Sequence, residues 1–196
     1  WIVHDCWESY FAYRKSKHAL CGAHLIRELR ALSEMGNQWA EKFSTLLFDL
    51  YDLTNKGTEQ LKPIDQELAS QLYDEICRSA DNLEPLAYRV KKQRGRIKQT
   101  DGRNLLNRLV KHKSAVIAFA FYQEVPFTNN LAERALRPVK TKQKVAGTWR
   151  TFKGAQQYAR IRSFVDTARK QQRNVFHELK LLFNGDSFIV NPWGGK

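Results

Sequence analysis

The chain lacks the features that mark membrane, secreted or modular proteins. No apolar run approaches the roughly 18–20 residues of a transmembrane helix, and no signal-peptide pattern or initiator methionine precedes Trp1. The cysteines, Cys6, Cys21 and Cys77, are odd in number and are not spaced as a disulfide framework. A reducing cytoplasm fits this usage best. Because Trp1–His4 resembles the middle of a strand, we expect a chain truncated upstream.

Acidic residues are scarce in two segments of the chain. Residues 89–113 hold 10 Lys/Arg against Asp101 alone, and residues 134–173 hold 12 against Asp166 alone, whereas residues 1–88 have a net charge of −5. Concentrated positive charge repels itself unless a polyanion is nearby, so nucleic acid is the expected partner. A solvated basic surface or an acidic protein partner is the alternative.

The apolar periodicity predicts a mainly α-helical protein with a small β component. Strands are expected at Trp1–His4 and His18–Cys21, and a short helix at Trp7–Tyr13. Further helices are expected from Ala23 to Gly36, over Trp39–Leu53, from Pro63 to about Pro85, over Asn104–Phe121, over Leu131–Arg137, over Gly154–Gln171 and over Val175–Phe183. On the third of these, Ile64, Leu68, Leu72 and Ile76 are in step. Pro138 is expected to end or kink its helix, and Thr141–Phe152 to be irregular.

Two carboxylates stand where chemistry is plausible. Asp5 follows a predicted buried strand, a common position for metal ligands, although a strand-end Asp can also simply cap the next turn. Glu133 shares a predicted helix face with Asn129, Asn130 and Arg137. The alternative for Glu133 is an ordinary surface pair with an arginine.

The segment around Glu133 resembles the signature of insertion-sequence-66 transposases. Asn129-Asn130, Ala132-Glu133-Arg134 and Leu136-Arg137-Pro138 are in register with that signature. Three weaker blocks occur in the family's order: Val3-His4-Asp5 with Tyr10-Phe11, Cys21-Gly22-Ala23-His24 with Arg27-Glu28-Leu29, and Ser163-Phe164-Val165-Asp166-Thr167-Ala168. Residues 36–120 share only a general helical character with it.

The resemblance implies a partial RNase H-like core of the DDE/integrase type, interrupted by an all-helical insertion. The core would comprise residues 1–35 and 123–183, the insertion residues 36–122, and a loose tail residues 184–196. Asp5 matches the second aspartate of the catalytic triad and Glu133 the glutamate, whereas the first aspartate would lie upstream of Trp1. The two carboxylates would then hold Mg²⁺ or Mn²⁺, two ions in each complete active site. This chain alone is expected to be inactive.

Other residues are assigned to support and DNA contact. Asn129, Asn130, Cys21 and His24 are candidates for active-site support. For Cys21 and His24, half a zinc site or a plain structural role is the alternative. Contacts to DNA are expected from a basic set and one aromatic that could stack on an unpaired base: Arg134, Arg137, Lys140, Lys142, Lys144, Trp149, Arg150 and Lys153. The alternative is that Trp149 belongs to the core.

Three functions remain open on the sequence alone. The first is metal-dependent phosphodiester cleavage and strand transfer at transposon ends, with double-stranded DNA as partner and the cytoplasmic nucleoid as location. The second is a decayed or repurposed, non-catalytic nucleic-acid-binding protein, and the third is a helical protein-interaction module. Self-association is also expected, through an open strand edge at Trp1–Val3.

Overall fold

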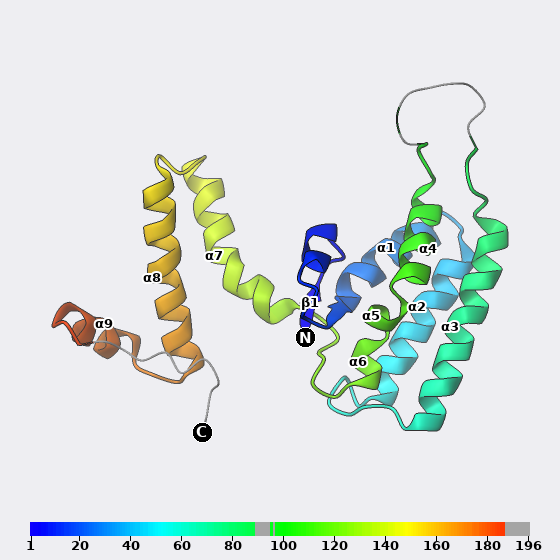
Figure 1. The fold of residues 1–196 in the computed structure, drawn as a ribbon, viewed down its shortest axis with the longest axis horizontal. Coiled ribbons are helices and arrows are strands. Elements are labelled where there is room, and N and C mark those ends of the chain that lie inside the picture. Colours follow the sequence, from blue (N-terminus) through cyan, green and yellow to red (C-terminus); the bar gives the residue numbers. More distant parts are fainter. Residues whose placement is uncertain (89–94, 96, 187–196) are drawn as a thin grey trace. The chain divides into compact units, whose positions relative to one another are not determined.

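The computed structural model describes residues 1–88, 95 and 97–186 and is mainly helical, with one parallel pair of short strands in the described part (Figure 1). The elements are β1 (Ile2–His4), the 3-10 helix η1 (Glu8–Ala12), β2 (His18–Leu20), α1 (Gly22–Glu34), α2 (Gln38–Leu53), α3 (Pro63–Leu83), α4 (Asp101–Lys111), α5 (Lys113–Val116), α6 (Ala118–Phe121), α7 (Asn130–Ala146), α8 (Phe152–Lys170) and α9 (Val175–Phe183). The chain forms two compact units, residues 1–129 and 130–196. Each is described by itself below as the first and the second unit.

The parallel pair brings two chain segments to one edge. Ile2 is in register with His18 and His4 with Leu20, so both predicted strands are confirmed. Parallel strands need a crossover connection, and η1 lies within it. Because both strands run in the same direction, Asp5 and Cys21 follow them at the same edge of the sheet.

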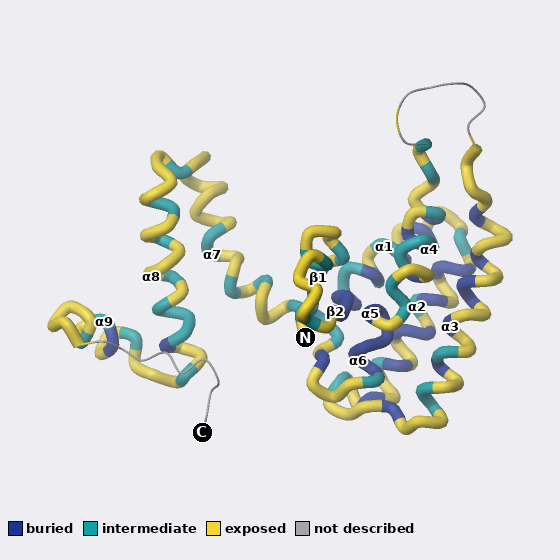
Figure 2. Tube along the Cα trace, in the orientation of Figure 1, coloured by how far each residue is buried: buried dark blue, intermediate teal, exposed yellow. Residues whose placement is uncertain are grey.

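Helices α1 to α4 enclose the core of the first unit. Gly36, with φ +91°, accepts the left-handed conformation that ends α1 as predicted. On α2, Trp39, Phe43 and Leu47 are almost fully buried. α2 packs against both α1 and α3, and Figure 2 shows the buried positions concentrated over α1 to α6.

The predicted apolar face of α3 is confirmed at Ile76 and wrong at its other three members. Ile64 and Leu68 remain 68% and 59% exposed, and the buried face instead carries Ala69, Tyr73, Ile76, Cys77 and Ala80. The Tyr73 ring packs edge-on against Phe43, with centroids 4.8 Å apart, and its hydroxyl donates to the carbonyl oxygen of Leu109 at 2.8 Å. These contacts with α2 and α4 select the Tyr73 stripe over the leucine stripe.

A buried carboxylate joins the ends of α2, α3 and α4. Glu84 is 7% exposed, and its two oxygens accept from Trp39 Nε1 at 3.2 Å and from Thr100 Oγ1 at 2.9 Å. Arg103 donates to the main-chain oxygen of Glu84 at 2.9 Å. We call this set the Glu84 clamp. Its residues Glu84 and Thr100 flank the basic segment 89–98 in the sequence, most of which lies outside the described residues.

A single helix over Asn104–Phe121 was predicted, and this is wrong, because α4 breaks at His112 and α5 breaks at Ile117. The backbone of His112 is non-helical (φ −116°, ψ 28°), and its ring stacks on Phe11 with centroids 4.3 Å apart. All residues from Ala115 to Ala120 are buried. A straight amphipathic helix buries only one face, whereas the breaks let the chain turn so that all six face the interior.

Helix α7 in the second unit is longer than predicted. It continues through Pro138 to Ala146, so an end at Pro138 and an irregular start at Thr141 are wrong, whereas a kink at Pro138 stays a prediction. Pro138 removes one backbone donor, and its carbonyl oxygen accepts from the Tyr158 hydroxyl at 3.5 Å. Lys, Gln and Ala, which favour helices, fill most of the following turn, and Gly147, with φ +72°, ends it.

Candidate active site

Three segments that are remote in sequence meet at the sheet edge of the first unit. The backbone N–H of Cys21 donates to the carbonyl oxygen of His4 at 2.8 Å, directly before Asp5. The N–H of Gly22 donates to the carbonyl oxygen of Phe127 at 2.8 Å, and the N–H of Asn129 donates to Cys21 Sγ at 3.4 Å. The end of β1, the start of α1 and the segment before α7 are therefore tied together.

Asp5 occupies the turn that follows β1. Its side chain is exposed, and one carboxylate oxygen accepts from the backbone N–H of Trp7 at 3.2 Å. The next residue, Cys6, has φ +70°, which makes the turn tight. This arrangement fits the capping alternative and also leaves an exposed, hard oxygen ligand at the strand end.

Two histidines, His18 and His4, form a chain of hydrogen bonds that ends at the residue after Asp5, and we call this chain the relay. His18 Nε2 is 3.2 Å from the carbonyl oxygen of Tyr13, His18 Nδ1 is 3.2 Å from His4 Nε2, and the N–H of Cys6 donates to His4 Nδ1 at 3.2 Å. A carbonyl only accepts, so His18 must donate through Nε2 and accept through Nδ1. His4 must then donate through Nε2, which leaves its Nδ1 to accept.

The relay closes only when both imidazoles are neutral. Burial first, and then the neighbouring His18, lower the pKa of His4 below its ordinary value. His4 is almost fully buried, with its ring stacked on Tyr10 at 4.8 Å. The neutral relay thus fixes the backbone of Cys6 and the turn that presents Asp5.

Close packing holds the segment before α7 against α1. Gly22 is buried, and a Cβ at this position would overlap the ring of Phe127. Phe127 is itself held by Phe119 and Tyr51, each with ring centroids 4.7 Å away. Glycine is therefore required here for close approach of the two segments.

We expect the effect of Gly22→Ala on the free energy of unfolding to change sign with the residue at position 127. In the helix the added methyl group favours folding by up to about 1 kcal/mol, but overpacking costs about 1–3 kcal/mol, so the single variant should be less stable. In a Phe127→Ala background the overlap is gone, and the same change should stabilise. The free energy of unfolding in urea tests both. The same sign in the two backgrounds would show that the ring does not constrain Gly22.

The proposed support residues occupy different places. Cys21, a buried free thiol, precedes α1, and His24 lies in its first turn. Asn129 lies before α7 and is positioned through its backbone by Cys21. Its Oδ1 is buried and has no hydrogen-bond partner among the described residues. The place where the end of β1, the start of α1 and the segment before α7 are tied together is called the strand-end junction below. Asn129 lies there, one residue before α7, and not on the face of that helix as predicted.

Glu133 lies in the first turn of α7, in the second unit, and is half-buried. Asn130 is the first residue of this helix, so it shares a face with Glu133 and Arg137 as predicted. A carboxylate in the first turn is favoured by the partial positive charge of the helix start.

The cations assigned to DNA contact are all exposed. They lie along α7, in the following turn and at the start of α8: Arg134, Arg137, Lys140, Lys142, Lys144, Arg150 and Lys153. Trp149 is half-buried, and its ring centroid lies 5.0 Å from that of Tyr158. That contact gives Trp149 a packing role within the second unit, whereas its neighbour Phe152 is 80% exposed.

Some features of this region escaped sequence reasoning. His4 stands in the Val3-His4-Asp5 block but His18 in no motif, and only the strand register reveals them as a pair. Arg108 forms an ion pair with Glu28, and burial raises the pKa of the nearby Cys6 thiol. Burial and Lys111 lower the pKa of His112, which stacks on Phe11. No spacing in the sequence links these residues.

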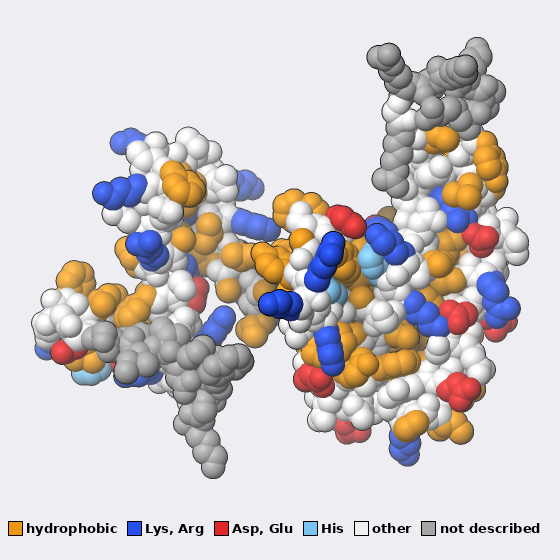
Figure 3. Space-filling view, viewed as in Figure 1, with side chains coloured by type: hydrophobic (Ala, Val, Ile, Leu, Met, Phe, Trp, Pro, Cys, Tyr) orange, Lys and Arg blue, Asp and Glu red, His pale blue; other side chains and the backbone are white. Residues whose placement is uncertain are grey.

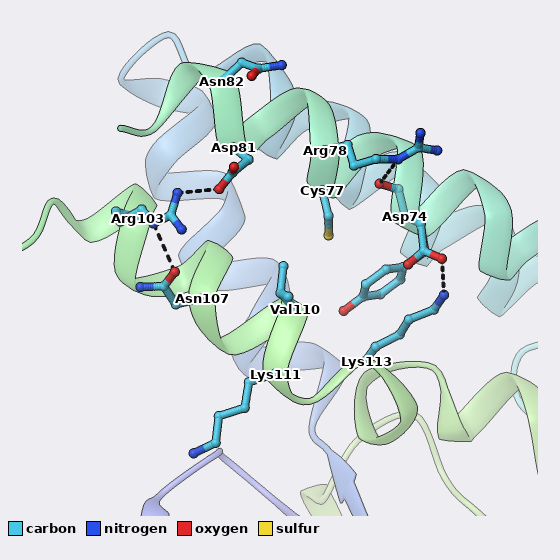
Figure 4. A pocket seen from close by; sticks show the side chains of 11 residues that line it. Asp74, Cys77, Arg78, Asp81, Asn82, Arg103, Asn107, Val110, Lys111 and Lys113 are labelled. Atoms are coloured by element: carbon cyan, nitrogen blue, oxygen red, sulfur yellow. Dashed lines mark hydrogen bonds and ion pairs between the residues drawn. The ribbon is translucent and has the colours of Figure 1, made fainter. Parts of the chain in front are cut away.

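A separate cavity of about 910 Å³ lies beside α3 and α4 (Figure 4). Two of the four cations in its lining pair with carboxylates there, Lys113 with Asp74 at 2.7 Å and Arg103 with Asp81 at 2.5 Å. The floor includes Cys77, whose pKa burial raises to about 11, so the thiol stays protonated near neutral pH. With four cations against two carboxylates, the lining is net positive.

Among the residues that the structure describes, no helix combines the length and the apolar character needed to cross a membrane. Comparisons with curated proteins and with solved structures found no match. Residues 1–157, well over half of the chain, match the model of the Transposase IS66 family.

Proposed function

Because the chain belongs to the IS66 transposase family, we propose that it forms part of the catalytic domain that cuts and joins DNA at transposon ends. The observation that carries this proposal is the junction at the sheet edge. There the Asp5 turn, the Cys21–His24 block and the segment leading to Glu133 are joined by hydrogen bonds. These are the blocks in which the sequence resembles the family, and they enclose a helical segment that we propose is an insertion into an RNase H-like core.

The donor set fits divalent cations. Asp5 and Glu133 offer carboxylate oxygens, which suit Mg²⁺ or Mn²⁺ better than soft metals. Bound ions would supply the charge that activates the attacking oxygen and stabilises the leaving one at phosphorus. The chain's own residues hold these carboxylates: the His4–His18 relay fixes the turn of Asp5, and the start of α7 carries Glu133.

The remaining parts of the proposal follow from the family pattern. The first aspartate of the triad would come from a strand before Trp1, so activity requires the longer protein. The exposed cations of α7 and α8 would bind DNA phosphates. Self-association through the β1 edge, where Trp1 is 38% exposed, also stays a proposal.

Metal removal tests the catalytic function. The complete transposase should cleave a duplex carrying its own transposon end in Mg²⁺, stop in EDTA and resume when Mg²⁺ or Mn²⁺ is restored. Duplex binding should survive EDTA, because phosphate contacts by lysine and arginine need no metal. Binding without cleavage in either metal, with an intact first aspartate, would instead favour the non-catalytic nucleic-acid-binding function.

A further inference from the structure

The leucine stripe of α3 stays outside the core of the first unit. Because the core is built on the Tyr73 face, Ile64, Leu68 and Leu72 remain exposed. These three residues follow one another at intervals of four, so they form one row along the helix that is about 12 Å long. Single exposed apolar side chains are common on protein surfaces, whereas contiguous apolar surface marks an interaction site. We call the three residues the α3 row.

The α3 row leads into a groove between α2 and α3, two helices that pack against each other. The groove has a volume of about 560 Å³, and its lining includes Leu72 of the row and the core residues Trp39, Leu46 and Ile76. An apolar floor is thus continuous with the row. Such grooves take the apolar face of an amphipathic helix, whose anchoring side chains recur every three or four residues. We call this feature the α2–α3 groove.

The rim of the α2–α3 groove is acidic. Glu41, Asp49 and Glu75 line it against Lys42 alone. All three carboxylates are exposed, and no ion pair between described residues involves any of them. Figure 3 shows several Asp and Glu side chains over α3, whereas Lys and Arg predominate over α7 and α8.

This acidic character extends over both helices and the turn between them. Residues 38–83 hold 9 Asp/Glu and 4 Lys/Arg, a net charge of −5 in a chain whose net charge is +13. Negative potential repels phosphates, so this face is unsuited to DNA. It is equally unsuited to a second copy of itself, because a two-fold contact brings the same patch of both copies together and sets acid against acid.

We propose that the α2–α3 groove and the α3 row together dock a basic amphipathic helix of a partner protein. The apolar side chains of that helix would lie on Leu68 and Leu72 and enter the groove. Its Lys and Arg residues would reach the rim carboxylates, which also steer the approach of a positively charged partner. The first unit would then carry a protein-binding face that needs neither a metal ion nor DNA.

The probe for this surface is a fluorescein-labelled model peptide of about 16 residues, with leucine at every third or fourth position and lysine and alanine elsewhere. A second peptide has the same composition but spreads its leucines around the helix, and a third carries glutamate in place of lysine. Fluorescence anisotropy follows binding to the full chain. We expect the first peptide to bind at least about tenfold more tightly than the other two, because it alone matches both the row and the rim.

Variants of the protein locate the binding site of the first peptide. Leu68→Gln with Leu72→Gln should weaken binding by about tenfold or more, because two apolar contacts are lost. Asp49→Asn with Glu75→Gln should weaken binding by about three- to tenfold and reduce its dependence on salt, because the charges at the rim are removed.

The matched control is Met35→Gln with Val110→Gln, which alters two exposed apolar residues of the first unit outside the groove. It should change the affinity less than about twofold, and circular dichroism verifies that every variant keeps its helices. Absence of binding by the first peptide, equal binding of the first two peptides, or equal affinity of the leucine variant and the control would overturn the proposal. A dimer in sedimentation velocity that Leu68→Gln with Leu72→Gln dissociates would overturn it too, because the face would then bind a second copy. None of these measurements involves DNA, so their outcome is independent of the proposed function.

Discussion

Replacing Glu133 with glutamine in the complete transposase is expected to abolish DNA cleavage and leave DNA binding nearly unchanged. The amide keeps the size of the side chain and the helix propensity of the position, but it removes the negative charge that a hard cation requires. We expect cleavage to fall on the order of 10³-fold or more. The lost interaction with the helix start should cost no more than about 1 kcal/mol in stability.

The measurement is single-turnover cleavage of a transposon-end duplex, alongside anisotropy binding of the same duplex. Glu75→Gln provides a matched control, because Glu75 is an exposed helical glutamate in the first unit. Asp5→Asn should reproduce the loss seen with Glu133→Gln. Cleavage near the unaltered rate in Glu133→Gln would remove this residue from the active site and leave the family signature without a catalytic carboxylate.

Replacing Glu84 with alanine should give the largest loss of stability among the changes considered for the first unit. It breaks the Glu84 clamp and leaves the Trp39 N–H buried without its acceptor. An orphaned buried donor costs about 1–3 kcal/mol, and the cavity adds to this, so we expect a loss of about 2–4 kcal/mol. Urea unfolding followed by circular dichroism measures it.

Two further variants separate the clamp from general effects of charge. Glu75→Ala removes an exposed glutamate from the same helix and should change the free energy of unfolding by less than about 0.5 kcal/mol. Glu84→Gln can still accept from Trp39 through its amide oxygen, so it should retain most of the stability. If Glu84→Ala were no more costly than Glu75→Ala, the hydrogen bonds of the clamp would contribute nothing to folding.

Much of the first unit could be predicted because local signals agree there. The buried spacing of Leu25, Leu29 and Leu32 and the stop at Gly36 predicted α1. Both strands were predicted, the first of them from the short, apolar and partly β-branched run Trp1–His4. Where the residues are compatible with only one secondary structure and one buried face, tertiary packing agrees with the local signals.

The errors arose where two patterns compete. On α3 the leucine stripe at Leu68 and the stripe at Tyr73 both have helical spacing, and only the contacts with Phe43 and Leu109 decide between them. On α7 a local rule about Pro138 was outweighed by the helix-favouring residues that follow it. Which of two competing patterns is adopted depends on the residues that the segment packs against, and the spacing of residues within the segment does not encode these.

The same division applies to the candidate site. Asp5 and Glu133 could be proposed from short motifs, because their neighbours in sequence carry the resemblance. The His4–His18 relay could not, because it depends on strand register, and neither could the link between Cys21 and Asn129. Asn129 was expected on a helix face, whereas the hydrogen bond to Cys21 Sγ places it at the strand-end junction. Long-range pairing, rather than residue type, defines that part of the site.

The link between Cys21 and Asn129 also bears on the order in which the protein folds. It joins residues 108 positions apart, whereas α1 to α4 contact mainly their neighbours in sequence. Closing so large a loop has an entropic cost that is met late, after local helices have formed. The strand-end junction should therefore be the last part of the first unit to assemble and among the first to open. Folding speed would then set when catalytic competence appears after synthesis, and the helical segment between the two residues would govern it.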